Sequence, residues 1–113
     1  MKKIELDKEG RVRIDVGVMS LLKPIPHGNY YKERVIKDKN LMGFRGRCSP
    51  GGQRAFVYRY RPKGKDENGN YFEKVNKTLG PWYDKNDPKE KDKIGITPAV
   101  ARKMAEEMRA KIV

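Results

Sequence analysis

Three stretches in the middle of the chain alternate between apolar and polar side chains, the pattern of β-strands that bury one face. Within RAFVYRYR, Arg59 and Arg61 alternate with Tyr58 and Tyr60, so one face of that strand is aromatic and the other cationic. The three predicted strands are LMGFRGRC (41–48), RAFVYRYR (54–61) and YFEKVNKTLG (71–80).

Apolar residues nearer each end of the chain recur at helical spacing instead. DVGVMSLLKP predicts a short helix that begins after Asp15 as N-cap and stops before Pro24. Its apolar face consists of Val18, Leu21 and Leu22. TPAVARKMAEEMRAKI predicts a longer helix with Thr97 as N-cap and Pro98 in its first position. The apolar stripe of this helix consists of Ala101, Met104, Ala105, Met108 and Ile112.

Two turns set the expected pairing of the strands. Asn68-Gly69 favours a two-residue type I′ hairpin. Counting outward from it pairs Glu67 with Asn70, Arg61 with Asn76, Arg59 with Thr78, and Tyr58 with Leu79. Pro50-Gly51-Gly52 suits a three-residue loop that ends in a glycine bulge. That loop pairs Cys48 with Arg54, and Gly46 with Phe56.

These elements predict an α+β fold, in which a three-stranded antiparallel sheet packs its aromatic face on the C-terminal α-helix, with a short N-terminal helix beside it. Residues 84–95 and PIPHGNYY (24–31) are expected to be loops, while residues 1–14 either form a strand near 11–14 or stay loose. The expected core consists of Phe44, Phe56, Tyr58, Tyr60, Val75, Leu79, Met104 and Met108.

The length and the charge narrow the choice of function. The chain has 113 residues, enough for one domain (1–113), and its 27 Lys and Arg against 15 Asp and Glu give a formal charge of +12. Such a protein attracts polyanions, nucleic acids first. An anionic membrane surface fits less well, because the basic residues do not follow one face of an amphipathic helix. No stretch has the length and apolarity of a membrane helix or secretory signal, so a cytoplasmic location is expected.

Few residues of the chain suit catalysis or metal binding. Cys48 is the one cysteine, expected to be a small buried side chain, and it can form neither a disulfide nor a zinc site within one chain. His27 is the one histidine and lies in a Pro/Gly-rich segment. We therefore expect no catalytic residues, no metal and no cofactor.

The sheet face opposite the aromatic one is the candidate binding surface. Arginine, asparagine and threonine side chains can contact base edges in a major groove wide enough for a two-stranded ribbon, and lysine can hold phosphates. The alternative is a solvated face that only keeps the sheet soluble. The candidate DNA-binding residues are Arg45, Arg47, Val57, Arg59, Arg61, Lys74, Asn76 and Thr78.

From Ile14 onward the chain resembles the N-terminal arm-type DNA-binding domain of phage and prophage integrases of the tyrosine recombinase class. The resemblance rests on the order and spacing of DVGVMSLLKP, GFRGRCSPGGQRAFVYRYR, KTLGPW and TPAVARKMAEEMRAKI. It implies binding of double-stranded DNA at arm-type sites through the sheet face. It also implies downstream core-binding and catalytic domains in the natural chain, and the helix that runs uncapped to Val113 fits such a continuation.

The chain departs from that family at several positions. Lys77 stands where an apolar residue is usual, Gly46 and Cys48 replace larger aliphatic residues, and the segments 62–71 and 84–95 are long. Two other functions stay open, an RNA-binding sheet and a protein-interaction module that recruits an acidic partner. The RNA alternative is weakened because Tyr58 and Tyr60 fall on the core face, away from any base.

Overall fold

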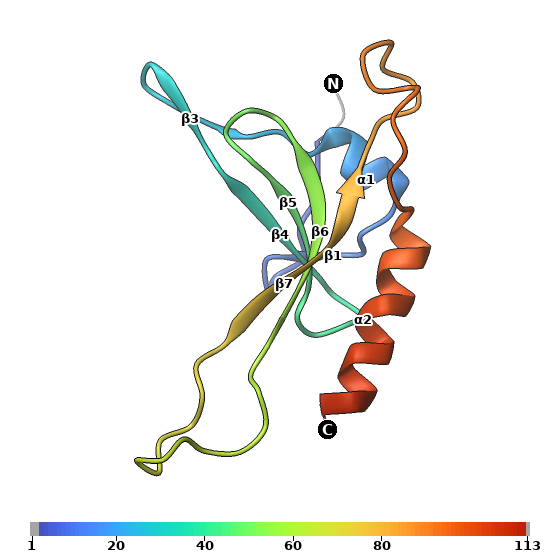
Figure 1. Ribbon diagram of the computed structural model, residues 1–113. Helices are drawn as coiled ribbons and strands as arrows, with labels where there is room; N and C mark the ends of the chain where they lie inside the picture. The colour runs from blue at the N-terminus through green and yellow to red at the C-terminus, as the bar shows by residue number, and fades with distance from the viewer. Residues whose placement is uncertain (1–2, 113) are drawn as a thin grey trace.

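A computed structural model describes residues 3–112 of the chain and shows an α+β fold with two helices on one face of a sheet (Figure 1). The main sheet has five strands in the order β1-β4-β5-β6-β7, where the sequence predicted three. Their bounds are β1 Arg11–Val12, β4 Arg34–Asp38, β5 Phe44–Cys48, β6 Arg54–Tyr60 and β7 Val75–Trp82. All neighbours are antiparallel except β1 and β4, which are parallel.

The prediction of a three-stranded sheet is wrong because β4 and β1 extend it. In β4, Ile36 and Asp38 point into the core while Val35 and Lys37 are exposed, so the strand alternates as a half-buried strand should. Lys37 and Asp38 pair with Arg11 and Val12 of β1. Of the strand expected near 11–14, only these two residues form one.

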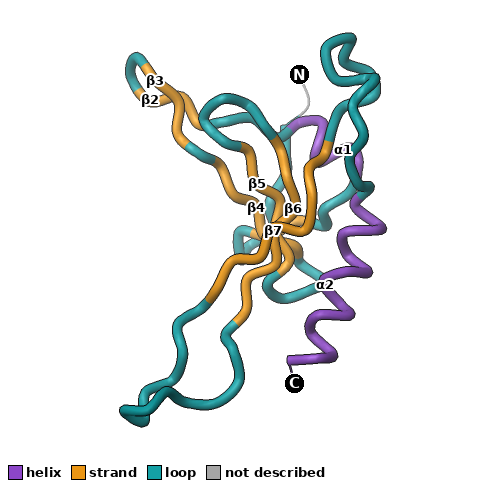
Figure 2. The backbone as a smooth tube through the Cα atoms, viewed as in Figure 1, coloured by secondary structure: helices purple, strands orange, loops and turns teal. Residues whose placement is uncertain are grey.

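The segment PIPHGNYY also differs from its prediction as a loop. It forms a two-stranded ribbon of β2 Ile25–His27 and β3 Tyr30–Lys32. Gly28 has φ of +61° in the two-residue turn between His27 and Tyr30, and glycine adopts that conformation without steric cost. The prolines do not prevent this ribbon, because Pro26 belongs to a strand that lacks a neighbour on its other side. Figure 2 shows the ribbon projecting from the body of the molecule.

The hairpin between β5 and β6 confirms the predicted register. Cys48 pairs with Arg54, and Gly46 pairs with Phe56. Ser49 N–H donates to the carbonyl oxygen of Gln53 at 2.8 Å, and Gly52 closes the three-residue loop with φ of +89°. The glycine bulge expected for Pro50-Gly51-Gly52 is therefore present.

The hairpin between β6 and β7 has a different register from the predicted one. Among residues 3–112 only glycines have positive φ, so Asn68 keeps negative φ and the type I′ turn does not form. The Asp66 carboxylate instead accepts from the backbone N–H groups of Asn68 and Asn70 and stabilises a longer turn. Arg59 consequently pairs with Asn76 instead of Thr78, and Tyr58 with Lys77 instead of Leu79; the pairings predicted for Arg61 and Glu67 are likewise absent.

Between Val57 and Tyr60 the shift in this register is two residues, so the side chains of residues 75–78 stay on their predicted faces. Asn76 and Thr78 lie on the same face as Arg59 and Val57. An irregularity between Phe56 and Val57 then leaves Leu79 as an extra residue of β7, and Leu79 joins the core.

Both helices begin at the predicted caps. Helix α1 (Val16–Leu21) starts where the Asp15 carboxylate accepts from Val18 N–H at 2.8 Å. Helix α2 (Pro98–Ile112) starts where Thr97 Oγ1 accepts from Val100 N–H at 3.2 Å. Ala101 and Ala105 of α2 are fully buried. The side chain of Ile112, and the predicted continuation at Val113, lie outside the described residues.

The core lies between the helices and one sheet face. Phe44, Phe56, Tyr58 and Leu79 are buried as predicted, and Tyr60, Met104 and Met108 are partly buried against them. The prediction of Val75 as a core residue is wrong, because its side chain is exposed at the start of β7. Lys77, two residues further along the strand, is exposed as well. Cys48 is buried as expected. The core also includes residues that were not predicted, namely Ile14, Met19, Leu22, Ile36, Leu41 and Trp82.

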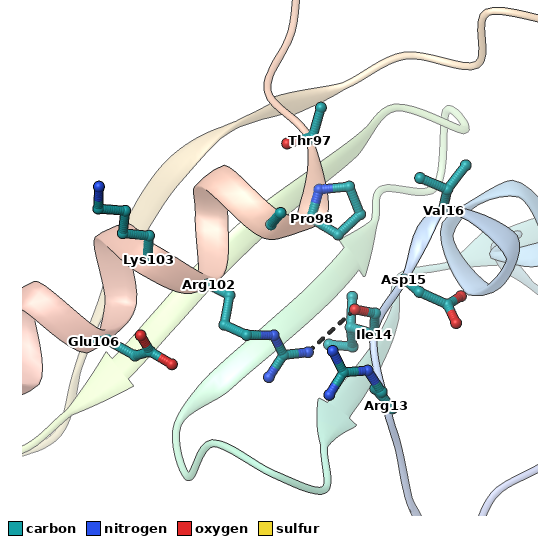
Figure 3. A pocket seen from close by; sticks show the side chains of 10 residues that line it. Arg13, Ile14, Asp15, Val16, Thr97, Pro98, Arg102, Lys103 and Glu106 are labelled. Carbon is teal, nitrogen blue, oxygen red and sulfur yellow. Dashed lines mark hydrogen bonds between the residues drawn. The ribbon is translucent and has the colours of Figure 1, made fainter.

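A buried ion pair joins α2 to the sheet. Asp38 at the end of β4 is fully buried, and both of its oxygens accept from the Arg102 guanidinium at 2.7 Å. Backbone N–H groups of Ile14, Asn40 and Leu41 also donate to this carboxylate. Arg102 donates further to the carbonyl oxygen of Ile14 at 3.2 Å (Figure 3). The pair therefore connects α2, β4 and the segment before α1.

The pKa of Asp38 records the same contacts. Burial by itself would raise the pKa of this carboxyl, but the hydrogen bonds from Arg102, Ile14 and Leu41, together with the charge of Arg102, hold it below its usual value. Hydrogen bonding to Asp38 in turn raises the pKa of Arg102 against the opposing effect of burial. The carboxylate of Asp38 therefore keeps its charge to lower pH than an exposed aspartate would.

A second arginine connects the other end of the sheet. Arg54 of β6 donates to the carbonyl oxygen of Met19 in α1 at 3.1 Å and to Glu90 of the 84–95 segment at 2.9 Å. Its guanidinium also lies over the ring of Trp82, 4.6 Å from the centroid. Arg54 is thus a structural arginine, in contrast to the arginines of the opposite face.

Arg102→Met tests the buried pair. We expect it to lower the free energy of unfolding by roughly 3–5 kcal/mol, because it leaves the Asp38 carboxylate buried without its charged partner. Urea unfolding measures the change, and Lys103→Met, an exposed neighbour on α2, is the control. A loss below about 0.5 kcal/mol, the usual range of surface substitutions, would contradict the assigned role.

The same carboxylate predicts acid sensitivity. Its folded pKa lies below its unfolded pKa, so its contribution to stability is complete above the unfolded value and disappears as pH falls through the folded value. We expect the urea midpoint of the wild-type protein to drop on acidification over that range. The midpoint of Asp38→Asn should be lower at neutral pH and should drop less, and parallel curves for the two proteins would exclude Asp38 as the group responsible.

Candidate nucleic-acid interface

The sheet face away from α1 and α2 carries the candidate residues. We call it the open face, formed by Val35 and Lys37 of β4, Arg45 and Arg47 of β5, Ala55, Val57 and Arg59 of β6, and Asn76 and Thr78 of β7. On the other face, a Cβ added to Gly46 would come within 2.9 Å of Met19 Sδ of α1. The two faces are thus distinguished by direct contact with a helix.

Strand pairing brings the arginines of the open face together. Arg45 pairs with Val57, which lies beside Arg59, and Arg47 pairs with Ala55. A surface hollow of about 280 Å³ on this face is lined by Glu33, Val35, Arg45, Arg47, Val57, Arg59 and Asn76. Side chains from four consecutive strands therefore converge on one site.

Arg45 is the cation with the least favourable surroundings. Burial, and then the positive charges of Arg59 and Arg11, lower the pKa of Arg45 from its usual value. Its Nε is buried without a hydrogen-bond partner, and within residues 3–112 neither Arg45 nor Arg59 forms an ion pair. An anion placed on this face would supply the missing negative charge.

The other predicted residues differ in how accessible they are. Arg47 is exposed and pairs with Glu33 at 3.4 Å, a surface contact that contributes little energy and that a phosphate can replace. Asn76, Thr78 and Arg59 are exposed. Val57 is only 4% exposed at the bottom of the hollow, so it supports the surrounding arginine stems and is not available for a direct base contact.

Arg61 and Lys74 lie beyond the ends of β6 and β7. Arg61 donates to the carbonyl oxygen of Phe72 at 3.0 Å, across the start of the 62–73 hairpin. Both side chains line a second hollow that also contains Arg45, Arg59 and Arg109. They extend the cationic surface along the sheet, although they do not pair with each other as sheet residues.

Two cationic residues on or beside the open face were not among the predicted ones. Lys37 of β4 pairs with Arg45, and Arg11 of β1 pairs with Lys37, so both add positive charge at the β1 side. The alternation in RVIKD (34–38) was the signal that β4 exists and that Lys37 faces outward. Arg11 had no comparable signal, because β1 consists of two residues held by a parallel neighbour.

A larger surface hollow lies elsewhere. It has a volume of about 560 Å³ and lies between the start of α2 and residues 13–16 (Figure 3). Its cationic residues Arg13 and Lys103 are accompanied by Asp15 and Glu106, and Arg102 within it is already paired with Asp38. This hollow therefore has no charge preference comparable with that of the open face.

Neither a family model, nor a curated protein, nor a solved structure matches this chain. The resemblance to integrase arm-type domains consequently stays a prediction. Within residues 3–112, no helix has the length and apolarity required to cross a membrane.

Arg59→Gln tests the electrostatic description of the open face. Removing one of several like charges should raise the free energy of unfolding at low salt by up to about 0.5 kcal/mol. The gain should shrink as salt is added, because salt already screens the repulsion. Urea unfolding at two salt concentrations measures it. A clear destabilisation would mean that Arg59 makes a stabilising contact and does not contribute to a repulsive cluster.

Proposed function

We propose that the chain binds double-stranded DNA through the open face. The observation that supports this proposal is the convergence of Arg45, Arg59 and Asn76, from three adjacent strands, on one hollow, with no ion pair for either arginine among residues 3–112. A cluster that repels itself in the free protein becomes favourable when phosphates neutralise it.

The shape of the sheet suits a groove of duplex DNA. A major groove about 12 Å wide admits two neighbouring strands spaced about 4.8 Å apart. With β5 and β6 in the groove, Arg45, Arg47 and Arg59 face the base edges, while Asn76 of β7 and Lys37 of β4 lie toward the two phosphate backbones. Arginine is the side chain most suited to guanine edges.

The finer assignment is to a site-specific recombinase. By its resemblance to integrase arm-type domains, the chain would hold arm-type sites while other domains of the same protein bind the core site and cleave it. Nothing in the open face suits strand cleavage, which needs a nucleophile and acid–base residues. In this proposal the described residues contribute DNA binding alone.

An RNA-binding sheet is the weaker alternative. Recognition of single-stranded RNA relies on exposed aromatic rings on which bases stack. The rings of the central strands face the core here, where Phe56 and Tyr58 are buried and Tyr60 partly so. A protein-interaction surface for an acidic partner remains the alternative of a different class, and the experiment below separates it from DNA binding.

The double variant Arg45→Gln plus Arg59→Gln tests the interface. We expect duplex affinity to fall by at least roughly tenfold, and the slope of log K against log salt to become shallower by about two, because two phosphate or base contacts are lost. Fluorescence anisotropy with a duplex selected by the wild-type protein from a random-sequence library measures both quantities. The melting temperature should not fall.

The matched control is Lys89→Gln plus Lys91→Gln, which removes the same charge from exposed positions of the 84–95 segment, outside the open face. Its affinity should stay within about threefold of wild type, since distant charges act only through a screened field. Equal losses in the two double variants would show that net charge, and not the open face, drives binding. Tighter binding of double-stranded RNA or of single strands than of the duplex would favour the RNA alternative.

A further inference from the structure

The β2–β3 ribbon has no structural role that accounts for its shape. All six of its residues are exposed, and in the five-stranded sheet it has no neighbour. A two-stranded ribbon without a core is only marginally stable in water. Its large side chains are nevertheless apolar or aromatic, with Ile25, Tyr30 and Tyr31 each about half exposed. Solvent alone does not favour such a surface.

The pairing of the ribbon places these side chains on two faces. Ile25 pairs with Lys32 and His27 pairs with Tyr30, so these four residues share one face. The rings of His27 and Tyr30 are in contact, with centroids 5.0 Å apart. Pro26 and Tyr31 pair on the other face. The ribbon thus presents a ring and an aliphatic wedge on each side near its tip.

Charge selects the class of partner. Between Lys23 and Lys32 the chain has no acidic residue. The hairpin at the other end of the sheet differs, because Asp66 and Glu67 lie at its turn and the ring of Tyr71 is covered by Lys65, 4.8 Å from the centroid. The β2–β3 ribbon is therefore the extension whose tip does not repel a polyanion.

The ribbon is continuous with the open face. Glu33 links β3 directly to β4, lines the hollow of the open face and pairs with Arg47 of β5. In Figure 1 the ribbon leans away from α2, toward the side on which the open face lies. Three residues of strand extend about 10 Å. If the sheet is docked in the major groove, a ribbon of this length extends across one phosphate backbone, and its tip reaches the far side of that backbone.

We propose that the β2–β3 ribbon is a second DNA-contacting arm, which places Tyr30 and the Pro26–Tyr31 face in the minor groove next to the major groove occupied by the open face. This proposal rests on the proposed function. Minor grooves accept arms with apolar wedge residues such as proline and isoleucine, which widen or kink the duplex at flexible base steps. The arm adds affinity through contact with sugars and base edges and leaves the count of neutralised phosphates unchanged.

Tethered cleavage tests where the arm lies. Asn29→Cys places a thiol at the tip of the ribbon for attachment of an iron–EDTA cleavage reagent, and buried Cys48 stays unmodified because it is 1% exposed. On the selected duplex, we expect cuts on both strands with the 3′ offset that is typical of cleavage from a minor groove, at one end of the protected site. Lys89→Cys, labelled in the same way, should produce no localised cuts.

Affinity measurements give the second test. Tyr30→Ala should weaken duplex binding roughly tenfold without changing the salt slope, because no charge is removed. Tyr71→Ala, in the opposite hairpin, removes a tyrosine of similar exposure, 65% against 58% for Tyr30, and should bind like wild type. Netropsin, a minor-groove ligand, should weaken wild-type binding and affect Tyr30→Ala less.

The possible results separate the two proposals. If wild type does not bind duplex DNA, or if Arg45→Gln plus Arg59→Gln binds as tightly as wild type, the proposed function fails and the arm fails with it. If that double variant loses affinity while Tyr30→Ala binds like wild type and the labelled Asn29→Cys protein does not cut, only the arm is overturned. Cuts with a major-groove offset would overturn the minor-groove placement.

Discussion

The fold depends on one fully buried carboxylate. Asp38 accepts hydrogen bonds from three backbone N–H groups and from both outer nitrogens of Arg102. Those donors belong to the segment before α1, the turn after β4 and helix α2. A carboxylate without these partners would be too costly to bury, so they must assemble together. This constraint fixes α2 against one face of the sheet, and the opposite face is left for function.

The two kinds of arginine in the sheet follow from this arrangement. On the helix side, the outer nitrogens of Arg54 donate to Met19 and Glu90 and its guanidinium lies over the Trp82 ring, so its positive charge holds α1 and the 84–95 segment, although its Nε, like that of Arg45, is buried without a hydrogen-bond partner. On the open face, Arg45 and Arg59 have each other for neighbours and no acidic partner among residues 3–112. Arginine therefore stabilises the fold on the helix side, whereas on the open face the arginines repel one another. Unfavourable contacts of this kind are typical of surfaces that bind a ligand.

Extensions at the two ends of the sheet add to the open face in different ways. The 62–73 hairpin carries acidic residues at its turn. Arg61, which directly precedes it, donates to the backbone carbonyl oxygen of Phe72. The β2–β3 ribbon carries aromatic rings and no acid, and it joins the sheet through Glu33, whose carboxylate partly neutralises Arg47. A sheet in one groove with a ribbon in the next would read a longer stretch of duplex than a three-stranded sheet alone.

Local pattern was sufficient for much of this structure. The caps at Asp15 and Thr97, the loop after Cys48 and the face of each residue in β5 and β6 depend on neighbours in sequence, so the sequence determined them. The prediction of the candidate arginines rested on this alternation of faces. The turn at Asn68-Gly69 was predicted wrongly because the Asp66 side chain, a competing local acceptor, selected a longer loop. The faces of residues 75–78 were still predicted correctly, since the register shift there was two residues.

Tertiary structure alone decided what depends on residues distant in sequence. Asp38 and Arg102 are 64 positions apart, and no periodicity relates them. The parallel pairing of β1 with β4, the exposure of Val75 beyond the cover of α2, and the burial of Val57 beneath arginine stems likewise arise from packing. A sequence determines which side of a strand each residue occupies, because side chains alternate along the backbone. Which side meets a helix, and which cations are left without partners, is determined only when the distant segments pack together.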